Sequence, residues 1–71
     1  MILTIDVGNS RIKVAVFEED KLIDLFVFEH QEALKKISEI VSFFPKISNA
    51  IYSSVGKLDA KVLELIKSKV K

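Results

Sequence analysis

The first part of the chain carries hydrophobic positions with the spacing of β-strands. Apolar and β-branched side chains gather in three runs that short polar segments separate. In the second run, Ile12, Val14 and Val16 alternate with other residues and share one face. The runs span residues 2–7, 12–17 and 22–28. The pattern predicts an antiparallel meander of strands with a hairpin turn at Gly8-Asn9, because both of these residues tolerate positive φ.

Further along the chain the period of the hydrophobic positions becomes helical. The apolar residues that fall on one helix face are Ala33, Leu34, Ile37, Ile40, Val41 and Phe44. Pro45 ends this helix, because the residue before a proline is pushed out of the α region. Residues 50–55 form a fourth apolar run that Gly56 ends, and a second helix is predicted from residue 58 or 59 to the end. The predicted order is β-β-β-α-β-α, in which a helical crossover lets the fourth strand lie parallel to the first.

The composition narrows the class of protein. A chain of 71 residues makes at most one small domain. Its hydrophobic fraction of 49% is more than so small a core needs, so some apolar surface is expected to meet another subunit or another part of the protein. A net charge of +1 gives no electrostatic footprint for nucleic acid.

The chain lacks several common kinds of site and signal. Without cysteine it has no thiolate metal site, and its single histidine cannot form a histidine cluster. That residue, His30, is expected to have a surface or capping role. The sequence shows neither a signal peptide nor an apolar run of membrane-spanning length, so a cytoplasmic protein without membrane contact is expected.

Polar chemistry is concentrated at the turn between the first two predicted strands. Asp6 ends a strand predicted to be buried, where a carboxylate is costly unless it meets a partner or a cation. Gly8 lets a ligand approach the backbone closely, and the amides around Asn9 and Ser10 suit phosphate oxygens. Lys13 adds a positive charge on the next strand. We interpret the segment as a phosphate-binding loop in which Asp6 holds Mg²⁺ through water.

A plainer interpretation of residues 6–9 stays open at this point. An Asp-x-Gly-Asn segment also suits an ordinary hairpin turn, in which the aspartate accepts backbone hydrogen bonds. Short motifs occur by chance, so four letters alone do not decide between the two. The context favours the phosphate loop, because the motif follows the first strand, opens a hairpin and precedes the β-α-β-α order.

Two segments together resemble a known family. Residues 1–17, MILTIDVGNSRIKVAVF, resemble the first phosphate-binding hairpin of the acetate kinase/sugar kinase/Hsp70/actin superfamily. Within it, the pattern Asp-Val-Gly-Asn-Ser-x-x-Lys resembles type III pantothenate kinases, in which threonine is commoner at the position of Ser10. Ser53-Ser54-Val55 resembles a segment that this family carries on its fourth strand, although Gly56 stands where proline is frequent.

The resemblance implies a fold and an activity. The fold is an α/β, ribonuclease H-like (actin-like ATPase) domain, of which residues 1–71 are expected to form the incomplete N-terminal part. The activity is ATP-dependent phosphorylation of pantothenate, the first step of coenzyme A biosynthesis. Mg-ATP and a monovalent cation, potassium or ammonium, are the implied cofactors. By position, the residues implied in binding the ATP phosphates are Asp6, Gly8, Asn9, Ser10 and Lys13, with Asp6 also linked to the metal.

Family members are several times longer, and their acceptor-binding and catalytic motifs have no counterpart in this chain. We therefore expect the 71 residues to hold no catalytic residue and to be inactive alone. Ser53 and Ser54 are expected either to line the substrate cleft or to bond to the following turn. A homo-oligomer is expected, because the fourth strand is an exposed edge that can pair with a second copy.

Two alternatives to this function remain. The chain can be a standalone, non-catalytic half-domain that self-associates through its sheet edge. It can also be part of another sugar-kinase-like ATPase, which Asp-x-Gly-Asn in place of Asp-x-Gly-Gly disfavours.

Overall fold

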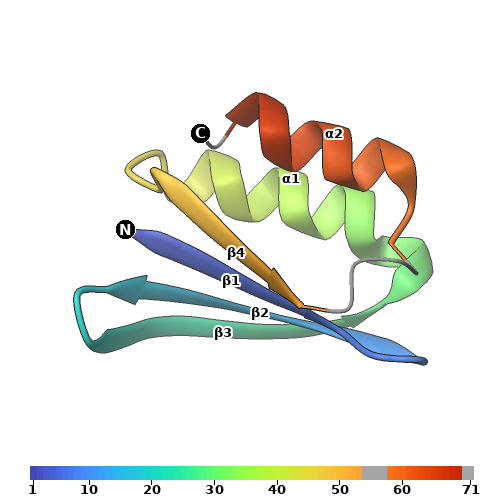
Figure 1. The fold of residues 1–71 in the computed structure, drawn as a ribbon, viewed down its shortest axis with the longest axis horizontal. Helices are drawn as coiled ribbons and strands as arrows, with labels where there is room; N and C mark the ends of the chain where they lie inside the picture. Colours follow the sequence, from blue (N-terminus) through green and yellow to red (C-terminus); the bar gives the residue numbers. More distant parts are fainter. Residues whose placement is uncertain (54–57, 70–71) are drawn as a thin grey trace.

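The computed structural model describes residues 1–53 and 58–69. They form a four-stranded sheet with both helices packed on one face (Figure 1). The elements are β1 (Ile2–Val7), β2 (Arg11–Glu18), β3 (Lys21–Glu29), the 3-10 turn η1 (His30–Glu32), α1 (Ala33–Phe43), β4 (Asn49–Ser53) and α2 (Ala60–Lys69). The predicted order of strands and helices is confirmed.

The sheet is mixed, with strand order β3-β2-β1-β4. β1 and β3 each pair antiparallel with β2, and β4 lies parallel to β1. α1 carries the chain from β3 at one edge to β4 at the other (Figure 1). The carboxyl ends of β1, β3 and β4 therefore meet at one end of the sheet. Both the meander and the parallel fourth strand at an edge were predicted, and both are confirmed.

The hydrophobic core lies between the sheet and the helices. Ile12, Val14 and Val16 of β2 all face it and have no exposed surface. The other core residues are Leu3, Ile5, Val7, Phe28, Ala33, Ile37, Ile40, Val41, Ile47, Val62 and Ile66. Leu34, predicted to share the buried face of α1, is instead 47% exposed. It lies at the margin of the apolar stripe, about 80° from the centre of the buried positions.

The opposite face of the sheet is not covered by either described helix (Figure 1). The buried residues of β1 all point toward the core, whereas Asp6 points outward and is exposed. The prediction that Asp6 ends a buried strand is thus wrong for its face of the sheet, because only the opposite face of β1 is covered by the helices. Asp6 stays hydrated, so its carboxylate carries no burial cost.

The helix ends are capped from within the chain. The side chains of Glu29 and Glu32 form a capping box around η1. Asp59 accepts a hydrogen bond from the Lys61 N–H at 2.8 Å and so caps α2, which begins at Ala60. α1 ends at Phe43, just before the position where Pro45 was expected to stop it. Residues 54–57, in which the predicted end of the fourth strand and Gly56 fall, lie outside the described residues.

None of the described helices is long and apolar enough to cross a bilayer.

Candidate phosphate site at the first hairpin

The register of the sheet places Asp6 between two polar partners. It pairs with Lys13 of β2 on one side and with Ser53 of β4 on the other. Paired residues project from the same face of a sheet, so all three side chains point outward, away from the helices. The Ser53 hydroxyl donates a hydrogen bond to Asp6 Oδ1 at 3.0 Å. The Asp6 carboxylate is therefore oriented by a strand 47 residues further along the chain.

The turn itself differs from the predicted one. The last pair of the β1–β2 ladder is Val7 with Ile12, and the Gly8 N–H donates to the Arg11 carbonyl at 2.9 Å. The tip therefore consists of Asn9 and Ser10. Among the described residues only Glu19 has a positive φ, so the prediction of positive φ at Gly8-Asn9 is wrong.

Glycine is nevertheless required at residue 8 for a steric reason. A Cβ atom on Gly8 would lie 2.9 Å from the carbonyl oxygen of Arg11. Real Cβ contacts are essentially never that short, and the obstructing atom belongs to the backbone. The close pairing of Gly8 with Arg11 therefore excludes any side chain.

A residue outside the motif also holds this turn. His30 Nε2 lies 2.7 Å from the Gly8 carbonyl oxygen, and because a carbonyl only accepts, the ring nitrogen donates. His30 is the first residue of η1 and is half-buried. Only a surface or capping role was expected for His30, so this contact was not predicted. The predicted meander could have indicated it, because the meander returns the end of β3, and with it His30, to the turn between β1 and β2.

The motif residues surround one open hollow. Its volume is about 490 Å³, and it is lined by Asp6, Gly8, Ser10, Arg11 and Lys13. It thus brings together four of the residues that the sequence singled out and adds Arg11. Asn9 is at the tip of the turn and does not line the hollow, and Ser54 lies outside the described residues. With two cationic side chains and one carboxylate, the lining favours an anion accompanied by a metal ion.

The residues fit a lightly held metal ion better than a caged one. No three His, Asp or Glu side chains among residues 1–53 and 58–69 come together in a way that could hold a metal. Asp6 offers a single exposed carboxylate. Mg²⁺ commonly keeps several waters and binds through one or two carboxylates plus substrate phosphates. One carboxylate beside an anion site is consistent with that mode.

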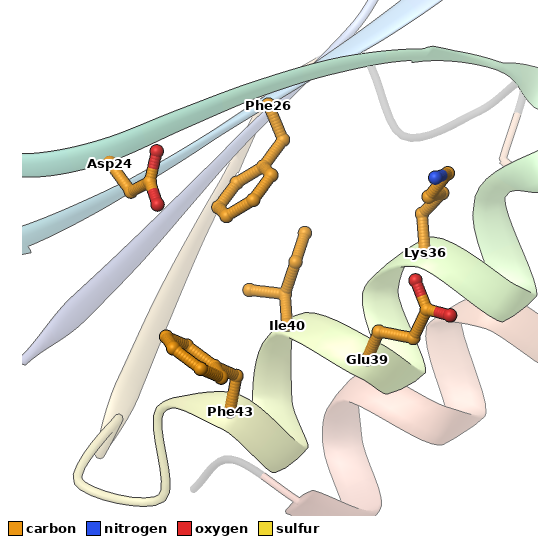
Figure 2. Close-up of a pocket in the computed structure, with 6 residues that line it drawn as sticks. All are labelled: Asp24, Phe26, Lys36, Glu39, Ile40 and Phe43. Carbon is orange, nitrogen blue, oxygen red and sulfur yellow. The ribbon is translucent and has the colours of Figure 1, made fainter.

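A second hollow, of about 390 Å³, lies between β3 and α1 (Figure 2). It is lined by Asp24, Phe26, Lys36, Glu39, Ile40 and Phe43. In Figure 2 the Phe26 ring extends from the strand toward Ile40 of the helix. This hollow is on the helix side of the sheet, opposite the face that carries Asp6. Its walls are mainly apolar and carry two acids beside one lysine, so it suits a phosphate less well than the hollow at the first hairpin.

Comparison with known proteins identifies the family. The sequence model of type III pantothenate kinases matches residues 2–70. The chain belongs to this family. It is 49% identical over 59 residues to the type III pantothenate kinase of Flavobacterium johnsoniae, a match that covers 83% of this chain and 24% of the relative. It is 41% identical over 70 residues to the type III pantothenate kinase of Flavobacterium psychrophilum, a match that covers 99% of this chain and 29% of the relative.

A third type III pantothenate kinase, from Christiangramia forsetii, is 36% identical over 67 residues, covering 94% of this chain and 28% of the relative. The matched parts of the chain thus span only 24% to 29% of the length of these relatives. No solved structure matches it. The strand order and the family match agree with an α/β fold of the actin-like ATPase type, in partial form.

Proposed function

We propose that this chain supplies the first phosphate-binding loop of an ATP-dependent pantothenate kinase, an enzyme that transfers the γ-phosphate of ATP to pantothenate. The observation that carries the proposal is the single hollow that Asp6, Ser10 and Lys13 share at the carboxyl end of β1. Ligands of α/β sheets bind at such strand ends. The relatives are type III pantothenate kinases by name.

The roles of the loop residues follow from which groups are already bonded. The Gly8 N–H is used by the Arg11 carbonyl, so Gly8 contributes close approach and not a donor. The backbone amide and the hydroxyl of Ser10, which lines the hollow, are the donors proposed for phosphate oxygens, and a part for Asn9 stays a prediction. Lys13 stabilises the negative charge of the phosphates from the adjacent strand, where Arg11 adds a second positive charge.

Asp6 is proposed to hold Mg²⁺ through water, with Ser53 fixing the direction of its carboxylate. When bound, Mg²⁺ would neutralise part of the charge on the ATP phosphates. Several further points stay predictions. They are a part for Ser53 or Ser54 in the pantothenate cleft, binding of a potassium or ammonium ion, assembly into a homo-oligomer, and a cytoplasmic location.

Phosphoryl transfer needs several groups placed around the reacting phosphate at once. The described residues offer one such site, so we propose that the 71-residue chain is inactive alone. The check is to incubate the purified chain with ATP and pantothenate and to follow both ATP hydrolysis and phosphopantothenate. Turnover above the buffer rate, absent from an Asp6→Ala preparation, would contradict this expectation.

The loop itself is tested in a hybrid. Residues 1–71 replace the matching segment of the Flavobacterium johnsoniae kinase, and Mg-ATP binding is measured by calorimetry. Asp6→Ala and Lys13→Ala are each expected to weaken binding strongly, by at least about thirtyfold for Lys13→Ala. Lys21→Ala, a lysine of the other hairpin turn, serves as the matched control and leaves binding unchanged. Normal binding by both site variants would exclude the proposed phosphate loop.

A second candidate is a non-catalytic module that self-associates. The observation that favours it is β4, an edge strand whose Ile51 is 59% exposed. Pairing of two such edges would join the sheets of two copies. Light scattering at increasing concentration measures this association, and a monomer throughout argues against it. Another sugar-kinase-like ATPase is no longer favoured, since the family match is to pantothenate kinases.

A further inference from the structure

Both backbone polar groups of Gly8 are bonded to other parts of the chain. Its N–H donates to the Arg11 carbonyl at 2.9 Å, and its carbonyl accepts from His30 Nε2 at 2.7 Å. The first bond closes the turn, and the second joins the turn to the end of β3. Neither peptide plane next to Gly8 can rotate without breaking one of these bonds.

The bond to the carbonyl also sets the direction of the next amide. No described residue follows a cis peptide bond, and in a trans peptide the C=O and the following N–H point to opposite sides. Because the Gly8 carbonyl points toward His30, the Asn9 N–H points away from it. We propose that His30 is a positioning residue for the phosphate loop: by fixing the peptide plane between Gly8 and Asn9, it sets the course of the backbone into Ser10, which lines the hollow proposed to take a phosphate. The identity of this ligand rests on the proposed function.

His30 is itself held in place from two directions. The preceding residue, Glu29, pairs with Arg11 across β2 and β3, so His30 begins beside the residue that closes the turn. The His30 carbonyl accepts the N–H of Ala33 at the start of α1. Its side chain is half-buried, whereas the side chains of Glu29 and Gln31 are exposed. The ring therefore presents Nε2 from a fixed place, as a supporting residue must.

In this contact the His30 ring acts as a hydrogen-bond donor and not as an acid or base. Neutral His30 must carry its proton on Nε2 to bond a carbonyl, and the imidazolium also donates from that nitrogen. The contact is thus compatible with both charge states. Glutamine, whose side-chain amide is a donor of similar reach, is the conservative replacement. Alanine leaves the Gly8 carbonyl to water.

The first experiment uses the isotope-labelled 71-residue chain without nucleotide. NMR is expected to find the neutral His30 proton on Nε2. His30→Ala is expected to shift the amide resonances of Asn9 and Ser10, and His30→Gln to restore both. Gln31→Ala is the matched control, because that side chain bonds Glu29 and not the loop. A proton on Nδ1, or an Asn9 amide that does not respond to His30→Ala, would overturn the inference.

The second experiment measures kinetics in the hybrid kinase. His30→Ala is expected to raise the KM for ATP about fivefold, the effect of one hydrogen bond, with kcat unchanged. His30→Gln stays within about twofold of the parent. Equal losses in both variants would show that the ring is needed for packing and not for its donor. If the parent hybrid does not use ATP, the proposed function fails, while the nucleotide-free experiment still decides the role of His30.

Discussion

β2 has a hairpin turn at each of its ends, and the two turns differ in what they can bind. The hollows beside them are similar in size, about 490 Å³ at the first turn and about 500 Å³ at the second. The first is lined by Asp6, Arg11 and Lys13 among others, and the second by Glu18, Glu19, Asp20 and Lys21. Three acids beside one lysine repel a phosphate. Charge and not volume therefore separates a candidate site from a plain turn.

The backbones of the two turns differ as well. Glu19 adopts a φ of 57° although it is not a glycine, and no contact outside the turn is needed to explain it. Gly8 has no positive φ, yet its N–H is bonded to Arg11 and its carbonyl to His30, and the Arg11 carbonyl leaves no room for a side chain. The second turn only has to reverse the chain. The first turn is also held by hydrogen bonds to neighbouring residues, so changes in it should cost more stability than changes in the second.

The largest effect is expected from a side chain at the first turn. Gly8→Ala places a Cβ against the Arg11 carbonyl, so we expect the free energy of unfolding to fall by about 1–3 kcal/mol and Mg-ATP binding by the hybrid to be lost. Urea denaturation and calorimetry measure the two effects. Asp20→Ala is the control in the other turn and should change the stability by less than about 0.5 kcal/mol. Equal stability of the two variants would remove the contrast between the turns.

Removing the charge of the first hollow comes next. Lys13→Ala in the hybrid should weaken Mg-ATP binding at least about thirtyfold, which is about 2 kcal/mol for a hydrogen bond to a charged group. Lys13 is exposed, so urea denaturation should find a stability within about 0.5 kcal/mol of the parent. A loss of binding that merely follows a loss of stability would argue that Lys13 supports the fold and not the phosphate.

Replacing the strained residue of the second turn, Glu19, should raise the stability of the protein. Glu19→Gly relieves a left-handed conformation that costs an L-residue about 1–2 kcal/mol, although glycine gives back part of this through the unfolded chain. We expect a net gain of about 1 kcal/mol in the free energy of unfolding, measured by urea denaturation, with no change in Mg-ATP binding. Weaker binding after this change would mean that the two ends of β2 are coupled.

The smallest effect is expected at Ser53. Ser53→Ala removes an exposed hydrogen bond to Asp6, so the free energy of unfolding should fall by only about 0.5 kcal/mol. The measurable consequence is a shift in the Mg²⁺ concentration that gives half-maximal ATP binding by the hybrid. Ser53→Thr keeps the hydroxyl and should restore the parent value. If alanine and threonine behave alike, Ser53 does not orient the carboxylate.

The sequence was sufficient for the fold because its pattern is local. Alternation in β2 predicted the inward face of Ile12, Val14 and Val16, and these residues are buried. The apolar period change near η1 predicted the helical crossover that makes β4 parallel to β1. The buried position predicted for Leu34 was wrong, because nothing in the local sequence tells whether an apolar residue at the margin of a helix's apolar face lies in the core or on the surface.

The site was predicted less completely, because its geometry depends on distant pairing. The hydrogen bond from Ser53 to Asp6 needs the register of two strands far apart in sequence. The tip of the turn depends on which residues of β1 and β2 pair last, and a one-residue difference moved it from Gly8-Asn9 to Asn9-Ser10. The contact from His30 to Gly8 exists only because β3 returns to the same end of the sheet.

That contact has a kinetic consequence. His30 lies 22 residues from Gly8, so the first hairpin can close in microseconds on its own but reaches its final shape only after β3 has docked. A ligand that recognises the loop then selects chains whose whole meander has folded, and it adds its binding free energy to the stability of all three strands. A ligand bound at the loop would therefore stabilise the whole of this small sheet and not only the turn that it touches.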